Sequence, residues 1–265
     1  MPLYLWPFRQ IRRNRILSRG LVPDRLWRRC LDDHPILAGL STADEQLLRE
    51  LTTVFLREKR FEPVQGLDLN ELMKTSIAVQ ACLPILHLGI DSYNDWSTII
   101  VYPAEFVRPR QEFDTAGVLH QWEEWLGGES WERGPVVLSW CDVEASGWGD
   151  GYNVVVHEMA HKLDMRNGDA DGYPALHRGM RPSEWSQAFT SAYEDLARVA
   201  ERGREPDIDD YATESPAEFF AVLSEYFFER PDLVAERYPQ VFQQLRLYYR
   251  QDPETRLPMR PQRGR

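Results

Sequence analysis

The pentapeptide His157-Glu158-Met159-Ala160-His161 constrains this chain more than any other segment of its sequence. It has the HExxH pattern, in which two histidines lie four residues apart. On an α-helix this spacing places both imidazoles on one face, about 6 Å apart along the helix axis. Imidazole nitrogens suit Zn²⁺, which prefers a tetrahedral set of N, O and S ligands. The motif therefore predicts a helix that carries two ligands of one zinc ion, His157 and His161.

Glu158 lies about 100° further round the same helix, so its carboxylate is beside the metal and not aimed at it. From there it can accept a proton from the attacking water and pass it to a leaving amine, as the catalytic base of a peptidase does. The alternative is two surface histidines on an ordinary helix with an intervening glutamate. The apolar residues of the segment favour the zinc interpretation, because they suit a helix buried against a core.

A catalytic zinc needs a third protein ligand and leaves a fourth position for water. The metzincin extension of the motif would put Gly at 164 and His at 167, but this chain has Asp164 and Asn167, which excludes that class. Asp164 shares the face of the two histidines but lies one turn beyond them, and three ligands on one straight helix converge poorly. We interpret Asp164 as a supporting or helix-end residue. The remaining option is a carboxylate from another helix, the gluzincin arrangement.

Two downstream helices offer such a carboxylate. The first, expected over 183–202, has a plainly solvated face that carries Glu184, Glu194 and Glu201. Glu218 and Glu225 instead lie on the apolar helix expected over 216–229, where an unpaired buried carboxylate would cost several kcal/mol. Glu218 also has an ordinary explanation, because it forms a capping box with Ser215. The residues by themselves leave Glu218 and Glu225 as equal candidates.

Composition places the chain among soluble globular proteins. Apolar residues make up 43% of its 265 residues and charged residues 28%, enough for one compact domain or two packed subdomains. The net charge of −11 argues against nonspecific binding to nucleic acid or anionic membrane. No stretch approaches the roughly 18–20 apolar residues of a membrane span, and arginines interrupt the start where a secretion signal needs an apolar run. We therefore expect a cytoplasmic protein with no nucleic-acid or membrane partner.

Arginines crowd the first thirty positions of this acidic chain, at Arg9, Arg12, Arg13, Arg15, Arg19, Arg25, Arg28 and Arg29. The ordinary interpretation is a solvated face or a contact between subdomains. The alternative is a docking segment for an acidic partner.

Hydrophobic patterning in the first half predicts helices followed by strands. Amphipathic helices are expected over 41–60, where Thr42 and Glu45 are spaced as a capping box, and over 68–83. Short β-branched runs predict strands at Thr98–Tyr102 and Pro135–Ser139. The second strand either offers an edge to a substrate peptide or belongs to the core.

The second half is expected to be mainly helical. Tyr152–Asp164 must be a helix for its chemistry to work, although its three consecutive valines would suit a strand. The other helices are expected at Ser183–Arg202, Pro216–Glu229 and Leu233–Arg250. This order predicts an α+β fold with a small sheet, divided into an N-terminal helical subdomain over 1–90 and a catalytic subdomain over 91–265.

The segments HEMAHKLDMRNGDADGYP and YATESPAEFFAVLSEYFF together resemble the Mlc titration factor A family of zinc metallopeptidases, over roughly Trp140 to Pro253. The resemblance implies one Zn²⁺ per chain, with Glu218, in the PAE of the second segment, as the third ligand. It also implies that Tyr211, seven residues earlier, stabilises the transition state. A phenol O–H aimed at a developing oxyanion is a donor suited to that role.

The same resemblance implies a fold similar to the catalytic domain of anthrax lethal factor and an aminopeptidase activity on peptide substrates. Some family members bind and sequester a glucose-responsive transcription repressor, which makes such a repressor a candidate partner. The alternative function is therefore a regulatory binding factor whose peptidase site is secondary or vestigial.

Other polar motifs have structural interpretations. Asn167–Gly172 mimics the start of an EF-hand loop, but the twelfth position is Arg178 where calcium needs Glu, so a hydrogen-bonded turn is expected. The remaining histidines have no partner at ligand spacing and are treated as structural: His34, His87, His120 and His177.

Overall fold

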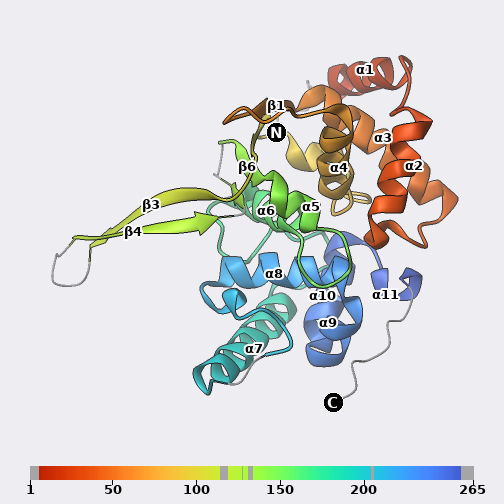
Figure 1. Ribbon diagram of the computed structural model, residues 1–265. Coiled ribbons are helices and arrows are strands. Elements are labelled where there is room, and N and C mark those ends of the chain that lie inside the picture. The colour runs from red at the N-terminus through yellow and green to blue at the C-terminus, as the bar shows by residue number, and fades with distance from the viewer. Residues whose placement is uncertain (1–5, 114–118, 127, 131–133, 204–205, 258–265) are drawn as a thin grey trace.

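In a computed structural model of the chain, helices pack around a small sheet and a long hairpin projects from the body (Figure 1). The structure describes residues 6–113, 119–126, 128–130, 134–203 and 206–257. Helices predominate, as expected for the α+β fold with a mainly helical second half. None of the helices in the described ranges is both long enough and apolar enough to cross a membrane.

The chain begins with the helices α1 (Trp6–Leu17), α2 (Asp24–Asp33), α3 (Thr42–Glu58) and α4 (Glu71–Cys82). The capping box predicted at Thr42 and Glu45 is wrong by one residue. The hydroxyl of Ser41 accepts the backbone N–H of Asp44 at 3.1 Å and so caps α3. Ser41 and Asp44 have the same spacing as the predicted pair, so the looser pattern that accepts Asp or Glu could not choose between them.

Several of the N-terminal arginines bind acidic groups of the body. Arg13 donates to Asp91 at 2.6 Å, and Arg9 lies 3.7 Å from the same carboxylate. Arg12 lies 3.7 Å from Glu58 at the end of α3. These contacts favour the ordinary interpretation of the arginine-rich segment, and the docking interpretation stays a prediction.

The sheet contains β1 (Arg60–Pro63), β2 (Thr98–Tyr102), β6 (Val136–Ser139) and β5 (Gly128–Ser130), in the order β1-β2-β6-β5. The first three run parallel and β5 pairs antiparallel to β6. The predicted strand at 135–139 is therefore β6, fully buried between two neighbours, and the edge interpretation of it is wrong. The edge beside the motif helix is formed by β5.

The hairpin joins β3 (Phe106–Phe113) to β4 (Leu119–Leu126), in antiparallel register from Phe106 opposite Leu126 to Phe113 opposite Leu119. Figure 1 shows it extending away from the helices, directly before β5 in the chain.

The second half contains α5 (Trp140–Ala145), α6 (Val154–Asp164), α7 (Pro182–Glu201), α8 (Pro216–Glu229), α9 (Pro231–Arg237), α10 (Pro239–Tyr249) and α11 (Pro253–Arg256). The single helix predicted over Leu233–Arg250 is wrong, because the chain breaks at Tyr238 into α9 and α10. Pro239 has no N–H to continue the first helix and instead starts the second.

One continuous cluster of buried apolar side chains runs from Val22 to Tyr249. Within it α6 packs against α4, α8 and the edge strand β5. The phenylalanines of α8 are almost completely buried, which anchors this helix under α6. The division at residue 90 stays a prediction.

Candidate active site

Helix α6 carries the HExxH motif and is fixed at its start by Asn153. The Asn153 side-chain oxygen accepts the N–H of Val156 at 2.9 Å, which caps the helix. Val154, Val155 and Val156 are all buried. Three consecutive residues span about 200° of a helix, so α6 is buried on more than one face. This burial overrides the strand propensity of three consecutive valines.

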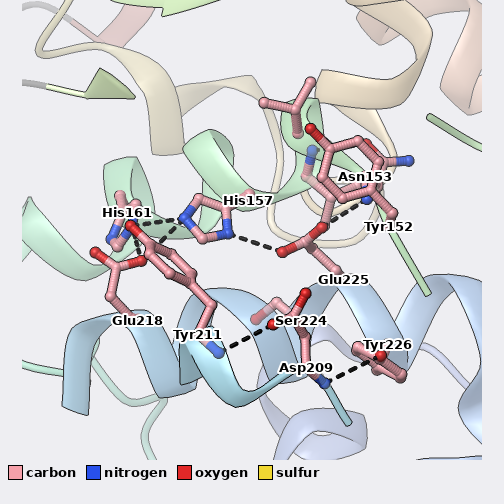
Figure 2. A network of polar contacts seen from close by, with 12 residues as sticks. Tyr152, Asn153, His157, His161, Asp209, Tyr211, Glu218, Ser224, Glu225 and Tyr226 are labelled. Atoms are coloured by element: carbon pink, nitrogen blue, oxygen red, sulfur yellow. Dashed lines mark hydrogen bonds and ion pairs between the residues drawn. The ribbon is translucent and has the colours of Figure 1, made fainter. Parts of the chain in front are cut away.

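His157, His161 and Glu218 converge on one point between α6 and α8 (Figure 2). The Nε2 atoms of the two histidines lie 3.1 Å apart. The Glu218 Oε2 atom lies 3.1 Å from Nε2 of His157 and 3.3 Å from Nε2 of His161. Two residues from one helix and one from another thus form a nearly equilateral triangle of ligand atoms, as the gluzincin arrangement requires.

This triangle has the size that a zinc ion needs. Tetrahedral bonds of 2.0–2.1 Å separate neighbouring ligand atoms by about 3.3–3.4 Å. The observed edges of 3.1 Å, 3.1 Å and 3.3 Å are close to that value. Two imidazole nitrogens and one carboxylate also form the ligand set of His₂Glu catalytic zinc sites, so these residues fit the metal.

Glu225 orients the first histidine from the opposite side. Its Oε1 atom lies 2.8 Å from Nδ1 of His157, and both residues are largely buried. A carboxylate on Nδ1 places the ring proton there and leaves Nε2 with its lone pair facing the triangle. The two equal candidates of the sequence therefore have different positions, with Glu218 at the triangle and Glu225 behind His157.

The charges of the cluster compensate one another. Burial alone would lower the pKa of His157, but hydrogen bonds to Glu218 and Glu225 outweigh it and raise that pKa well above its usual value. Burial likewise opposes ionisation of Glu218, yet the two histidines hold its pKa well below the usual range. The site therefore favours a positive charge between carboxylates, which is the environment that a divalent cation prefers.

Glu158 lies in the same helix turn as His157 and is only 3% exposed. It packs directly against the edge strand, because a Cβ atom added to Gly128 would lie 2.5 Å from its Oε1 and 2.8 Å from its Cγ. Only a residue without a side chain leaves room for this carboxylate. Gly128 thus holds β5 close to the proposed base.

We expect Gly128→Ala to lower kcat by about a hundredfold, because a shift of roughly 1 Å in a catalytic group can cost that much. The metal affinity should stay near that of the wild type, since the three atoms nearest to the added methyl all belong to Glu158 and not to the triangle. Peptide hydrolysis and zinc content measured on the same preparation test this. Unchanged turnover would show that Glu158 can move without consequence.

Tyr211 lies in η5 (Asp210–Thr213), a short 3₁₀ helix just before α8. Its ring centroid is 6.1 Å from that of His157, and Figure 2 shows its hydroxyl end directed towards the triangle. The carboxylate of Asp209 accepts the Tyr211 N–H at 2.9 Å, and the Asp209 N–H donates to the hydroxyl of Tyr226 at 3.2 Å. Two hydrogen bonds therefore fix the turn that presents Tyr211.

Asp164 is completely buried but lies outside the triangle. Its Oδ2 accepts the N–H of Gly172 at 2.7 Å, and burial raises its pKa to about 6. It holds the loop that follows α6, which agrees with its interpretation as a supporting residue. In that loop Asp171 accepts the N–H of Tyr173 at 3.0 Å, which is the hydrogen-bonded turn expected for the EF-hand mimic.

The other sequence candidates lie away from the triangle. The glutamates of α7 are exposed, as expected: Glu184, Glu194 and Glu201. His34 is buried, 2.7 Å from the carbonyl oxygen of Cys30 through Nδ1 and 2.9 Å from the hydroxyl of Ser76 through Nε2. His87 and His177 contact other groups: Nε2 of His87 lies 3.4 Å from Asp44, and Nε2 of His177 lies 2.7 Å from the carbonyl oxygen of Tyr248. The side chain of His120 lies outside the described residues.

Sequence reasoning missed three residues that support this geometry: Gly128, Asn153 and Glu229. Nothing in the sequence marks Gly128, because its role depends on which strand lies beside α6. Asn153 could have been found, since a residue of its type just before an apolar helix predicts an N-cap. Glu229 could have been found by the burial argument that identified Glu218 and Glu225.

Comparison with known proteins gives a consistent assignment. The model of the family described as glucose-regulated metallo-peptidase M90 matches residues 8–250. Mlc titration factor A of Cronobacter sakazakii is 41% identical over 230 residues, which are 85% of this chain and 86% of the relative. The protein of the same name from Enterobacter sp. is 39% identical over 259 residues, or 95% of this chain and 93% of the relative. The chain therefore belongs to the M90 family of metallopeptidases.

Proposed function

We propose that this metallopeptidase uses one Zn²⁺ held by His157, His161 and Glu218, in the gluzincin manner, to hydrolyse peptide bonds. The observation that carries the proposal is the triangle of two imidazole nitrogens and one carboxylate oxygen, with edges of 3.1–3.3 Å. When bound, the metal polarises the attacking water and the scissile carbonyl.

Three side chains around the triangle are proposed to transfer the proton, stabilise the developing oxyanion and orient a ligand. Glu158 accepts the proton of the attacking water and then donates it to the leaving amine, which its burial beside the triangle favours. Tyr211 donates a hydrogen bond to the carbonyl oxygen as negative charge develops there. Glu225 keeps His157 in the tautomer and orientation that ligation needs.

Removal of the metal with a chelator tests whether peptide hydrolysis depends on zinc. We expect dialysis against a zinc chelator to abolish peptide hydrolysis, and one equivalent of Zn²⁺ per chain to restore it. Peptides with free and with acetylated N-termini, assayed in parallel, test the aminopeptidase activity that we propose in addition. Cleavage of both forms at equal rates would exclude an aminopeptidase. A fully active chelated protein would exclude the metal mechanism itself.

A second function follows from the name of the relatives, Mlc titration factor A, which says that they titrate Mlc. We propose that this chain also binds a transcription repressor, and that it acts in the cytoplasm, where such a repressor would be found. The alternative to a peptidase is then a regulatory binding factor whose metal site is secondary or vestigial. A variant that keeps its metal but cannot activate water separates the two functions.

A further inference from the structure

A chain of buried hydrogen bonds leads from the far end of α8 to the imidazole of His157. Glu229, in the last turn of α8, is 3% exposed and accepts from Nδ2 of Asn153 at 2.8 Å. The backbone N–H of Asn153 donates to Oε2 of Glu225. The other oxygen of Glu225 lies 2.8 Å from Nδ1 of His157.

Asn153 lies at the centre of this series of hydrogen bonds, and both polar groups of its side chain are engaged. It is completely buried, and its amide group donates to Gln80 at 2.9 Å as well as to Glu229. Its side-chain oxygen caps α6 by accepting the N–H of Val156. Rotation of the Asn153 side chain would therefore break three hydrogen bonds together: the cap of α6, the contact with Gln80 of α4 and the contact with Glu229.

Glu229 holds the Asn153 side chain and also the loop that precedes it. Its second oxygen accepts the backbone N–H of Gly149, in the loop that leads to α6. Gly149 and Gly151 have φ of 75° and 115°, values that favour glycine and give this loop its sharp course. One buried carboxylate thus joins the approach loop and the N-cap of the motif helix to α8.

We propose that Glu229 is a positioning residue that acts on His157 through Asn153 and Glu225. The proposal rests on the function proposed above only in taking His157 as a metal ligand. Glu225 aligns the ring directly, and Glu229 keeps Asn153 where it holds both the helix start and Glu225. Metal affinity and turnover, and not the fold alone, depend on this carboxylate.

Three substitutions test this in the full-length protein. Glu229→Ala removes both acceptor oxygens. Glu229→Gln keeps the shape of the side chain, but its NH₂ group cannot accept a hydrogen bond, so either Asn153 or Gly149 loses its acceptor. Asn153→Ser keeps a capping oxygen for α6 but removes the Nδ2 group that donates to Glu229 and to Gln80. The matched control is Tyr249→Phe, which removes another buried hydrogen bond to α8, the 2.8 Å contact with Ser224, without touching Asn153.

Zinc affinity is measured by competition with a chromophoric chelator, at a temperature where circular dichroism shows each variant folded. We expect Glu229→Ala to weaken zinc binding about tenfold, the lower end for residues that support a ligand, and Glu229→Gln to weaken it less. The visible spectrum of the Co²⁺-substituted protein should change in the same order, and kcat should fall more than KM rises. Tyr249→Phe should alter thermal stability but neither readout.

Wild-type zinc affinity and Co²⁺ spectrum in folded Glu229→Ala would overturn the proposal. If that variant does not fold, unaltered affinity in both Glu229→Gln and Asn153→Ser overturns it equally. A wild-type protein that binds no zinc would instead refute the proposed function. The affinity measurement therefore distinguishes the two failures.

Discussion

Glu158→Gln is expected to lower kcat by about 10²–10⁴-fold while leaving the metal bound, the range over which general acid–base catalysis contributes. Glutamine has the shape of glutamate, so it fits beside Gly128, but it cannot accept a proton from the attacking water. None of the triangle atoms belongs to Glu158, and zinc content should therefore equal that of the wild type. Steady-state hydrolysis of a peptide substrate, with metal analysis of the same sample, provides the measurement.

The same variant separates catalysis from partner binding. If repressor binding is a distinct function, the Glu158→Gln protein should still retain a purified repressor on a column. Loss of both would tie the two functions to one site. Normal turnover in this variant would refute the proposed mechanism.

The second large effect concerns the two glutamates of α8. Glu218→Ala should weaken zinc binding by roughly 10²–10³-fold. This takes as a guide the apparent 10–16 kcal/mol of structural zinc sites, divided among their four protein ligands. Glu225→Ala should cost less, about 10–100-fold, because it removes only the partner that orients His157. Activity at limiting zinc should fall in the same order.

Titration of each variant with zinc measures this difference, and Glu184→Ala serves as the matched control because its carboxylate is exposed on α7. The opposite order, with Glu225→Ala losing the metal first, would contradict the assignment of Glu218 as the third ligand. Equal losses would mean that both carboxylates reach the ion.

The sequence predicted the motif helix because the chemistry of HExxH works only on a helix. The spacing of residues could not choose between Glu218 and Glu225, since they lie seven residues apart on one face of α8; only the family resemblance favoured Glu218. The choice depends on the packing of α8 against α6, which brings Glu218 to Nε2 of both histidines and Glu225 to Nδ1 of His157. Such register between helices is set by tertiary packing and leaves no local pattern.

Errors elsewhere have similar physical causes. The edge strand β5 has only three residues, from Gly128 to Ser130, too few to show alternation, so the sequence does not reveal it as the edge. The break before Pro239 could have been predicted, because proline cannot continue a helix. The similarity to the anthrax lethal factor domain stays a prediction.

Helix α8 presents three carboxylates to the site and its neighbours while its phenylalanines form part of the core. The rings of Phe220 and Trp185 lie 5.8 Å apart, and those of Phe227 and Phe242 5.6 Å apart. A cavity opened behind α8 would shift the whole row of carboxylates, so stability and catalysis cannot vary independently along this helix. Substitutions that shrink these buried rings are therefore expected to lower activity as well as stability, although the rings do not reach the triangle.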